Sequence, residues 1–340
     1  MKSVLITGGA GFIGSNFIEH FLRKNEDFFV VNLDLLSYAG DLANLSEITQ
    51  DKSLAKRYKF IKGDICNAGL LSYIFESFEI KAVIHFAAES HVDNSILNPA
   101  IFTQTNVLGT QNLLESAKKA WLAAPNEPKK DYEEARFHHI STDEVYGSLG
   151  KTGLFTEKTP YAPNSPYSAS KAGSDFLVRA YHKTFGLNTV ITNCSNNYGP
   201  KQHAEKLIPT IIRNALQKKQ IPIYADGQNI RDWLYVKDHC EGIELAFFKG
   251  QSGQSYNIGG RNERTNLQIA TKICEILDSL KPLAGGGKYA DLIGFVEDRA
   301  GHDKRYAIDA SKIEAELGWK AKEDFESGIL KTVEWYLALN

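Results

Sequence analysis

Residues 1–14 read MKSVLITGGAGFIG, an apolar run that ends in glycines and passes into a helical pattern. Gly8, Gly11 and Gly14 follow one another at three-residue spacing between the run and the pattern. Glycines there permit a tight turn, close approach of the backbone to a pyrophosphate, and close packing of helix on sheet. The free N–H groups at the start of the helix would face the phosphates. The stretch therefore predicts a dinucleotide-binding turn.

An acidic residue follows the second apolar run at the distance that such a turn requires. Asp34 comes directly after residues 28–33 and lies 20 residues after Gly14. A carboxylate at this place binds the ribose hydroxyls of the adenosine. It would repel a 2′-phosphate, and Leu35 and Leu36 supply no compensating cation. The pattern favours NAD over NADP, and the alternative is a structural turn with an incidental aspartate.

Short apolar runs alternate with helix-length segments through the first 195 residues. The runs are residues 4–6, 28–33, 58–61, 82–87, 137–140 and 189–192, and the segments include residues 70–78, 100–123 and 166–185. Continuous apolar runs of this length are typical of parallel strands that helices cover on both faces. The alternation predicts a doubly wound (Rossmann) α/β fold with a parallel sheet.

The alternation breaks down after about residue 195. Strand-like pieces at residues 221–224 and 255–258 are interleaved there with helical patterns at residues 206–217, 266–280, 311–317 and 325–337. We expect residues 1–195 to form the NAD-binding Rossmann domain. Residues 196–340 are expected to form a smaller, mixed α/β lobe that binds the substrate, with some exchange of chain between the two.

The composition excludes several classes of protein. The 340 residues carry 39 basic and 41 acidic side chains, so we expect no nucleic-acid-binding surface. No apolar run is long enough to span a bilayer, and the opening strand leaves no room for a signal peptide. The four cysteines lie far apart without a CxxC pair, which favours reduced thiols over disulfides or a zinc site. We therefore expect a cytoplasmic protein without a metal site.

Tyr167 and Lys171 lie four residues apart, on one face of a helix that Pro166 can begin. A phenol has a pKa of about 10, which is too high for a general base at neutral pH, and a nearby ammonium lowers it. The pair can therefore take a proton from an alcohol as a hydride leaves. A solvated helix face is the alternative, and the dinucleotide turn favours the catalytic interpretation.

Residues 138–147, HHISTDEVYG, place Asp143 and Glu144 after the fifth apolar run, at the edge where open α/β sheets bind ligands. Both acids can reach one substrate only if the chain turns here, because neighbours in a strand face opposite ways. Oxidation of a sugar at carbon 4 makes the hydrogen on carbon 5 acidic. One carboxylate could remove this proton while a protonated carboxyl helps the carbon 6 hydroxyl to leave. A solvated loop or a cap is the alternative.

The whole chain resembles the extended short-chain dehydrogenase/reductase family. GGAGFIG, Asp34, GDI at residues 63–65, FAA at residues 86–88 and YSASK at residues 167–171 carry the resemblance. It implies Tyr167 as base or acid for a sugar hydroxyl, and Lys171 as a ribose contact that tunes the Tyr167 pKa. The NAD-binding residues that it implies are Gly8, Gly11, Phe12, Ile13, Gly14, Asp34, Ser37, Asp64, Ile65, Ala87, Ala88, Tyr167, Lys171 and Asn197.

STDEVYG resembles the nucleotide-sugar 4,6-dehydratases, whereas simple epimerases of the family usually carry a non-acidic stretch here. This resemblance implies Asp143 as the acid for the leaving hydroxyl, Glu144 as the base at carbon 5, and Thr142 as a partner of the sugar. The strings NNYGP, EKLIP, RDWLYV and DRAGHDKRYAID are similar to members that use dTDP-glucose. The implied substrate-binding residues are Ser90, Thr142, Asn196, Lys206, Leu207, Pro222, Tyr224, Arg231, Asn266, Arg299 and His302.

The chain departs from the family pattern in places that bear on the nucleobase. Ala204 and Ala300 stand where the family often has proline, and residues 225–227 differ from the usual string. These departures bear on the shape of the loops and the choice of nucleobase and leave the chemistry unchanged. The alternative function is a UDP-sugar 4-epimerase, against which Asp143 and Glu144 argue, or a dehydratase that acts on another nucleotide-sugar. The resemblance also implies a homodimer that forms through the helices near residues 100–123 and 166–185.

Overall fold

The computed structural model describes residues 1–298 and 302–339, and seven of its strands form one parallel sheet. The order across the sheet is β12-β8-β7-β4-β1-β2-β3, so that the chain winds outward in both directions from β1. The strands are β1 (Lys2–Thr7), β2 (Phe28–Asp34), β3 (Tyr58–Lys62), β4 (Ile80–His85), β7 (Arg136–Thr142), β8 (Thr189–Cys194) and β12 (Gln254–Ile258). The predicted Rossmann fold is confirmed.

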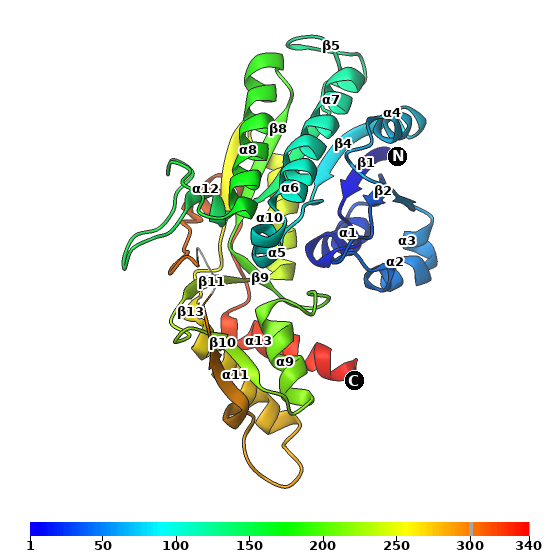
Figure 1. Cartoon of the computed structure of the whole chain (residues 1–340). Coiled ribbons are helices and arrows are strands. Elements are labelled where there is room, and N and C mark those ends of the chain that lie inside the picture. The colour runs from blue at the N-terminus through cyan, green and yellow to red at the C-terminus, as the bar shows by residue number, and fades with distance from the viewer. Residues whose placement is uncertain (299–301, 340) are drawn as a thin grey trace.

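Helices cover both faces of this sheet (Figure 1). One face packs against α1 (Phe12–Lys24), α10 (Val236–Lys249) and α12 (Ser311–Leu317), and the other against α4 (Ala68–Ser77), α7 (Thr110–Trp121) and α8 (Pro166–Phe185). Successive residues of β1 alternate between the two cores: Val4 and Ile6 contribute to the first, and Leu5 to the second. This period of two, with apolar residues on both sides, explains the continuous apolar runs.

The residues at its two ends define α8. Ser165 accepts a hydrogen bond from the backbone N–H of Ser168 and Pro166 occupies the first turn, where its missing N–H costs nothing. Gly186 closes the helix with φ 72°, a left-handed conformation that suits glycine. The predicted helix 166–185 is confirmed to the residue, and it places Tyr167 in its first turn.

Two segments differ from the sequence-based expectations. The predicted helix 100–123 is interrupted: α6 (Pro99–Phe102) passes through a π-helical segment, Thr103–Gly109, into α7. The chain then forms β5 (Leu122–Ala124), which pairs with β6 (Glu127–Pro128).

The first 195 residues supply six strands of the large sheet, and β12 joins β8 as the seventh strand, with α10 packed against α1. The boundary at residue 195 stays a prediction.

The remaining chain builds a smaller lobe below the sheet in Figure 1. Its strands are β9 (Asn196–Tyr198), β10 (Ile221–Tyr224), β11 (Ile230–Tyr235), β13 (Glu263–Thr265) and β14 (Ile293–Val296), and its helices are α9 (Leu207–Leu216), α11 (Asn266–Leu280) and α13 (Phe325–Ala338). A core of its own lies between these helices and strands, centred on Tyr198, Ile211 and Ile273. The described chain also holds the short helices α2 (Ser46–Gln50), α3 (Lys52–Ala55) and α5 (Val92–Leu97), and 3₁₀ turns that include Leu42–Leu45 and Tyr289–Leu292.

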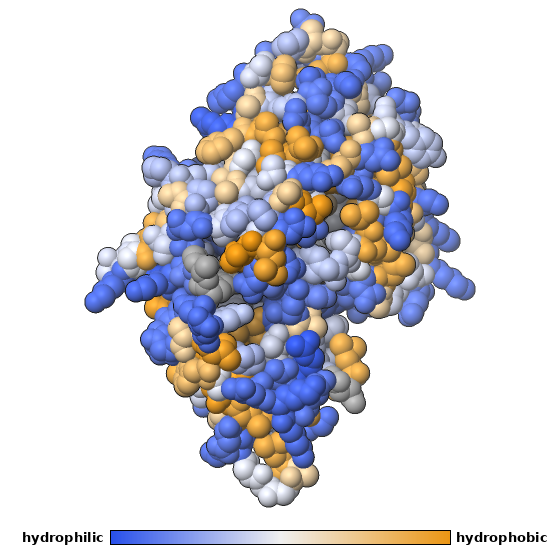
Figure 2. All heavy atoms as spheres, viewed as in Figure 1, coloured by the Kyte–Doolittle hydropathy of each residue, from blue (hydrophilic) through white to orange (hydrophobic). Residues whose placement is uncertain are grey.

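Hydrophilic side chains cover much of the face seen in Figure 2, with apolar patches between them. Among the described residues, no helix combines the length and the apolar character that crossing a membrane would need.

Candidate functional site

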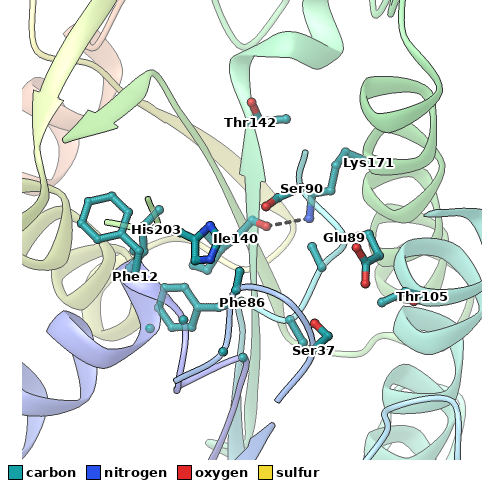
Figure 3. A pocket seen from close by; sticks show the side chains of 18 of the residues that line it. Phe12, Ser37, Phe86, Glu89, Ser90, Thr105, Ile140, Thr142, Lys171 and His203 are labelled. Carbon is teal, nitrogen blue, oxygen red and sulfur yellow. Dashed lines mark hydrogen bonds between the residues drawn. The ribbon is translucent and has the colours of Figure 1, made fainter. Parts of the chain in front are cut away.

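A cavity that is open to solvent lies at the carboxyl ends of the central strands (Figure 3). The glycine turn after β1, the ends of β2, β4, β7 and β8, the first turn of α8 and residues 202–206 line it. This is the place at which the order of strands reverses on either side of β1, and where doubly wound sheets bind their ligands. Walls from both halves of the chain thus enclose one site.

The glycine turn is tight enough to exclude side chains. Gly8 has φ 72°, and a Cβ atom there would lie 2.6 Å from the backbone nitrogen of Ala87. A Cβ on Gly14 would lie 2.3 Å from the carbonyl oxygen of Gly8. These two glycines therefore permit the close approach of turn, helix and neighbouring strand. The backbone is left bare at the start of α1, which is the arrangement that binds a pyrophosphate.

Asp34 is anchored at the end of β2 with its carboxylate on the cavity wall. One oxygen accepts a hydrogen bond from the Ala10 N–H at 2.9 Å, and the other accepts from the Leu36 N–H at 2.8 Å. Each carboxylate oxygen has a second lone pair, so that two hydroxyls of a ribose could still be bound. The geometry suits a dinucleotide without a 2′-phosphate, because the described lining of the cavity holds no arginine.

All the residues predicted to bind the cofactor line this one cavity: Gly8, Gly11, Phe12, Ile13, Gly14, Asp34, Ser37, Asp64, Ile65, Ala87, Ala88, Tyr167, Lys171 and Asn197. They come from six separate stretches of sequence. The set fits NAD in its chemistry. Backbone donors at the start of α1 would face the pyrophosphate, Asp34 would bind the adenosine ribose, and Tyr167 and Lys171 would lie beside the nicotinamide. Their contacts with a bound cofactor stay a prediction.

The chain does turn after β7, as joint action of the two acids requires. Asp143–Tyr146 form a single 3₁₀ turn, and the Thr142 hydroxyl caps it by accepting a hydrogen bond from the Glu144 N–H at 3.3 Å. The same hydroxyl donates to an Asp143 carboxylate oxygen at 3.4 Å. Thr142, Asp143 and Glu144 all line the cavity, with Asp143 buried and Glu144 partly exposed.

The environment of Asp143 favours its protonated form. Burial raises the pKa of this carboxyl well above its usual value, and the charges of Glu144 and Asp232 raise it further, against the opposing effect of Arg231. One of its oxygens has no hydrogen-bond partner. A neutral carboxyl in this position can donate a proton, whereas the more exposed Glu144 is the better candidate for a base.

Tyr167 and Lys171 both reach the cavity from the first two turns of α8. The Lys171 ammonium donates a hydrogen bond to the carbonyl oxygen of Ile140 at 2.8 Å, as Figure 3 shows. Burial raises the pKa of Tyr167 well above its usual value, as does the charge of Glu144, and a hydrogen bond with Thr142 opposes this. From the sequence we expected Lys171 to lower this pKa, but the desolvation of the phenol has the largest effect.

Four of the predicted substrate-binding residues also line the cavity: Ser90, Thr142, Asn196 and Lys206. The Ser90 hydroxyl lies 3.1 Å from the Tyr38 hydroxyl. The Lys206 ammonium donates to the Ser90 carbonyl oxygen at 3.2 Å, which ties the start of α9 to the loop after β4. Lys206 therefore brings a positive charge to the side of the cavity that faces the smaller lobe.

The other predicted substrate-binding residues stand outside the described lining of this cavity: Leu207, Pro222, Tyr224, Arg231, Asn266 and His302. The Arg231 guanidinium donates to the carbonyl oxygens of Asp303 and Lys304 at 2.9 and 3.4 Å. The rings of His302 and Tyr224 meet edge to face at 6.0 Å. Arg231, Tyr224 and His302 thus belong to one region of the smaller lobe. Arg299 lies outside the described residues.

The sequence analysis missed several residues of the cavity wall, among them Glu89, His203 and Thr105. Glu89 follows β4 in a loop, and burial raises the pKa of its carboxyl, as does the charge of Glu205. No periodicity marks such residues, although the position of Glu89 directly after FAA was a usable signal. Among the described residues, no group of three or more His, Cys, Asp and Glu side chains could hold a metal ion.

This arrangement can perform proton chemistry on an alcohol beside a hydride acceptor. A phenol, a protonated carboxyl and a second carboxylate face one cavity, and a buried ammonium stands one helical turn from the phenol. When bound, a nicotinamide cofactor would supply the site that accepts and returns a hydride.

Comparison with known proteins agrees with this geometry. The family described as GDP-mannose 4,6 dehydratase matches residues 5–332. A dTDP-glucose 4,6-dehydratase from Salmonella typhimurium is 54% identical over 344 residues, which cover 98% of this chain and 92% of that protein.

Solved structures show the same likeness. The dTDP-glucose 4,6-dehydratase DesIV from Streptomyces venezuelae, with NAD and TYD bound, has a TM-score of 0.87 and 45% identity, covering 99% of this chain and 97% of that one. A UDP-glucose 4-epimerase from Thermotoga maritima, with UDP-glucose, has a TM-score of 0.84 at 26% identity, covering 99% of each chain. The chain therefore belongs to the GDP-mannose 4,6-dehydratase family, in its group of dTDP-glucose 4,6-dehydratases.

Proposed function

We propose that this protein converts dTDP-glucose into dTDP-4-keto-6-deoxy-glucose and water, with NAD as its cofactor. The observation that carries the proposal is the meeting of two acids of different environment, Asp143 and Glu144, with Tyr167 and Lys171 in one cavity. The family to which the chain belongs supports the reaction type, and the relatives at about half identity support the substrate.

The residues act in three steps, and a bound nicotinamide would supply the site that accepts the hydride of carbon 4 and returns it to carbon 6. Tyr167 takes the proton of the carbon 4 hydroxyl as this carbon is oxidised. Glu144 then removes the proton of carbon 5, and Asp143 gives its proton to the carbon 6 hydroxyl, which leaves as water. Glu144 finally returns a proton to carbon 5. The proton gained by Tyr167 balances the one lost by Asp143, and the cofactor would be unchanged overall.

The assignment of acid and base follows from the environments. Asp143 begins the cycle protonated because burial raises its pKa, which is the state that a leaving hydroxyl requires. For Tyr167, burial favours the neutral phenol. The positive charge of Lys171, together with that of an oxidised nicotinamide, would favour the phenolate once the complex forms.

A UDP-sugar 4-epimerase is the less favoured function. An epimerase needs only the oxidation and its reversal at carbon 4, and nothing in that reaction requires a protonated carboxyl beside a second carboxylate. The epimerase structure from Thermotoga maritima is 26% identical, against 45% for the Streptomyces venezuelae dehydratase.

We propose that the nucleotide lies toward the smaller lobe. Asn196 and Lys206 line that side of the cavity, and Tyr224, Arg231 and His302 lie farther along the same lobe. The guanidinium and the ammonium would offer the charge that a diphosphate needs, because cations and bidentate donors bind phosphate strongly.

The proposed function predicts which nucleotide-sugar reacts. Purified protein incubated separately with dTDP-, UDP-, CDP- and GDP-glucose should form a 4-ketosugar and lose water with dTDP-glucose at the highest kcat/KM. Product NMR and the alkaline absorbance of the ketosugar measure this. Formation of a 4-epimer without loss of water would overturn the dehydratase assignment, and a preference for another nucleotide would overturn the substrate alone.

We also propose that the protein is cytoplasmic and forms a homodimer through the helices that carry the catalytic tyrosine. Leu108 and Phe176 are half exposed or more on this side, whereas Phe102 and Tyr181 pack inward. The Val107 side chain abuts Gly173 of α8, so that the two exposed residues belong to one surface. Exposed apolar side chains gathered in this way are typical of an interface.

Replacing Phe176 by Glu should convert the dimer into a monomer, because a charge in a closed apolar interface leaves its hydration shell without compensation. Sedimentation velocity measures the change. Phe295→Glu is a matched control, since Phe295 and Phe176 are both 58% exposed and Phe295 belongs to β14 in the smaller lobe. Equal masses for wild type and Phe176→Glu would contradict the proposed interface.

A further inference from the structure

Burying the charged Lys171 side chain costs free energy, and the reaction scheme does not explain what offsets that cost. It is only 4% exposed, and its ammonium has one well-formed hydrogen bond, to the carbonyl oxygen of Ile140 at 2.8 Å. Burial lowers its pKa to about 8. An ammonium in such a place tends to lose its proton, and a neutral amine would no longer favour a phenolate on Tyr167.

A second buried charge lies one helical turn farther along α8. Asp175 is 2% exposed, and one of its carboxylate oxygens accepts hydrogen bonds from the Ser141 hydroxyl at 2.9 Å, the Tyr161 hydroxyl at 2.8 Å and the Asn193 amide at 3.3 Å. Tyr167, Lys171 and Asp175 are spaced by four, so they share one face of the helix. Three donors converge here on a carboxylate that no step of the reaction uses.

The imidazole of His139 stands between the two charges. Its Nε2 lies 3.4 Å from the Lys171 nitrogen, in a long hydrogen bond. The same Nε2 lies 3.1 Å from the second oxygen of Asp175, which has no aligned hydrogen-bond partner. Burial lowers the pKa of His139 well below its usual value, so the ring is neutral. The path from the ammonium through the ring to the carboxylate is therefore continuous and closed to solvent.

Apart from the Glu144 carboxylate on the cavity wall, whose charge acts on Tyr167 and Cys194, the other titratable groups nearby carry no charge at neutral pH. Burial lowers the pKa of His85 and raises those of Cys194, Tyr146 and Tyr161. Asp175 has the largest effect that opposes the desolvation of Lys171. Burial raises the pKa of Asp175 to about 6, which Lys171 and the three donors counteract. Both groups are thus charged between about pH 6 and pH 8.

We propose that Asp175 is a positioning residue for catalysis, whose buried carboxylate, through the ring of His139, holds the Lys171 ammonium charged and directed toward Tyr167. The inference rests on the proposed function of Tyr167 and Lys171. Asp175 touches neither the sugar nor the nicotinamide, and it acts only through Lys171. Its three neutral donors hold the carboxylate in place, so that the charge stays where Lys171 needs it.

Asp175→Asn tests the charge with little change of shape. The Asn oxygen can accept from Ser141, Tyr161 and Asn193, and its NH₂ replaces the carboxylate oxygen that faces His139, so the three donors retain their acceptor. The titration of Lys171 is followed by NMR of protein labelled with ¹⁵N at the lysine side-chain nitrogens, with the signal assigned from Lys171→Met. No cofactor or substrate is needed.

We expect the Lys171 pKa to fall by ~1 pH unit or more in Asp175→Asn, since loss of an opposite charge leaves burial unopposed. Tyr161→Phe removes one donor and keeps the charge, so it should leave the Lys171 pKa closer to the wild-type value. An unchanged Lys171 pKa in a folded Asp175→Asn protein would overturn the inference. If that variant does not fold, His139→Gln, which removes the ring between the charges, provides the second measurement.

The same change should be visible in catalysis. Activity that requires the ammonium is lost as pH rises through the Lys171 pKa, so the alkaline limb of the kcat profile should move to lower pH in Asp175→Asn. At a pH above the Lys171 pKa of both proteins, a pKa that is lower by one pH unit reduces kcat by about tenfold. Wild-type protein that does not turn over dTDP-glucose refutes the proposed function, and the NMR result still tests Asp175. If the wild-type protein is active and the alkaline limb of the kcat profile does not move in Asp175→Asn, only the positioning role of Asp175 is refuted.

Discussion

Tyr167→Phe is expected to abolish the oxidation at carbon 4 and to leave the affinity for NAD nearly unchanged. The phenol is buried and its ring meets that of Phe102 edge to face at 6.3 Å, so a phenyl ring keeps the packing. Only the hydroxyl that takes the carbon 4 proton is lost. General bases of this kind contribute about 10²–10⁴-fold to a rate. Rapid mixing with dTDP-glucose, followed by the absorbance of the reduced nicotinamide, measures the step directly.

A matched control separates the chemistry from the stability of α8. Tyr181 lies on the same helix, and its hydroxyl donates to Glu115, away from the cavity. Tyr181→Phe should therefore oxidise the sugar at nearly the wild-type rate. Reduced nicotinamide that forms as fast in Tyr167→Phe as in wild type would remove Tyr167 from the role of base.

Glu144→Gln is expected to stop the reaction one step later. The sugar should still be oxidised, so reduced nicotinamide should accumulate, while the hydrogen on carbon 5 should no longer exchange with deuterium from the solvent. Overall turnover should fall by about 10²–10⁴-fold, since an amide cannot accept this proton. NMR of the sugar in D₂O measures the exchange, and absorbance measures the oxidation in the same sample.

The neighbouring acid gives the opposite pattern. Asp143→Asn removes the proton that helps the carbon 6 hydroxyl to leave, but Glu144 remains. Exchange at carbon 5 should therefore continue while loss of water stops. Exchange that persists in Glu144→Gln and disappears in Asp143→Asn would interchange the two roles. The buried position of Asp143 and its raised pKa argue for the assignment made above.

Much of the cofactor side could be predicted from the sequence because its signals are local. The glycine turn, the helix after it and the aspartate that ends the second strand lie within 34 residues, and each has a steric or electrostatic reason to be where it is. The first turn of α8 was predictable in the same way, since Ser165, Pro166 and Gly186 define both ends of the helix.

The substrate side was less predictable because its residues meet only through packing. Glu89 and His203 lie 114 positions apart in the sequence, and no periodic pattern joins them, yet both line the cavity. Asp175 was missed for a different reason. Its spacing from Lys171 was visible, but a charged residue on a helix is ordinarily taken for a solvated face, and only the fold shows that β7 and β8 cover it.

The sequence by itself determined the sheet that alternates with helices, the preference for NAD, and the presence of a tyrosine, a lysine and two acids of the right chemistry. Those properties depend on residue type and on short spacings, which the covalent chain already contains. Only the tertiary structure decided the protonation of these groups. Burial raises the pKa of Asp143 and outweighs the expected lowering of the Tyr167 pKa. It also lowers the pKa of Lys171, and the charge of Asp175 opposes this effect. Desolvation is a property of packing, and the packing brings in residues from the whole chain.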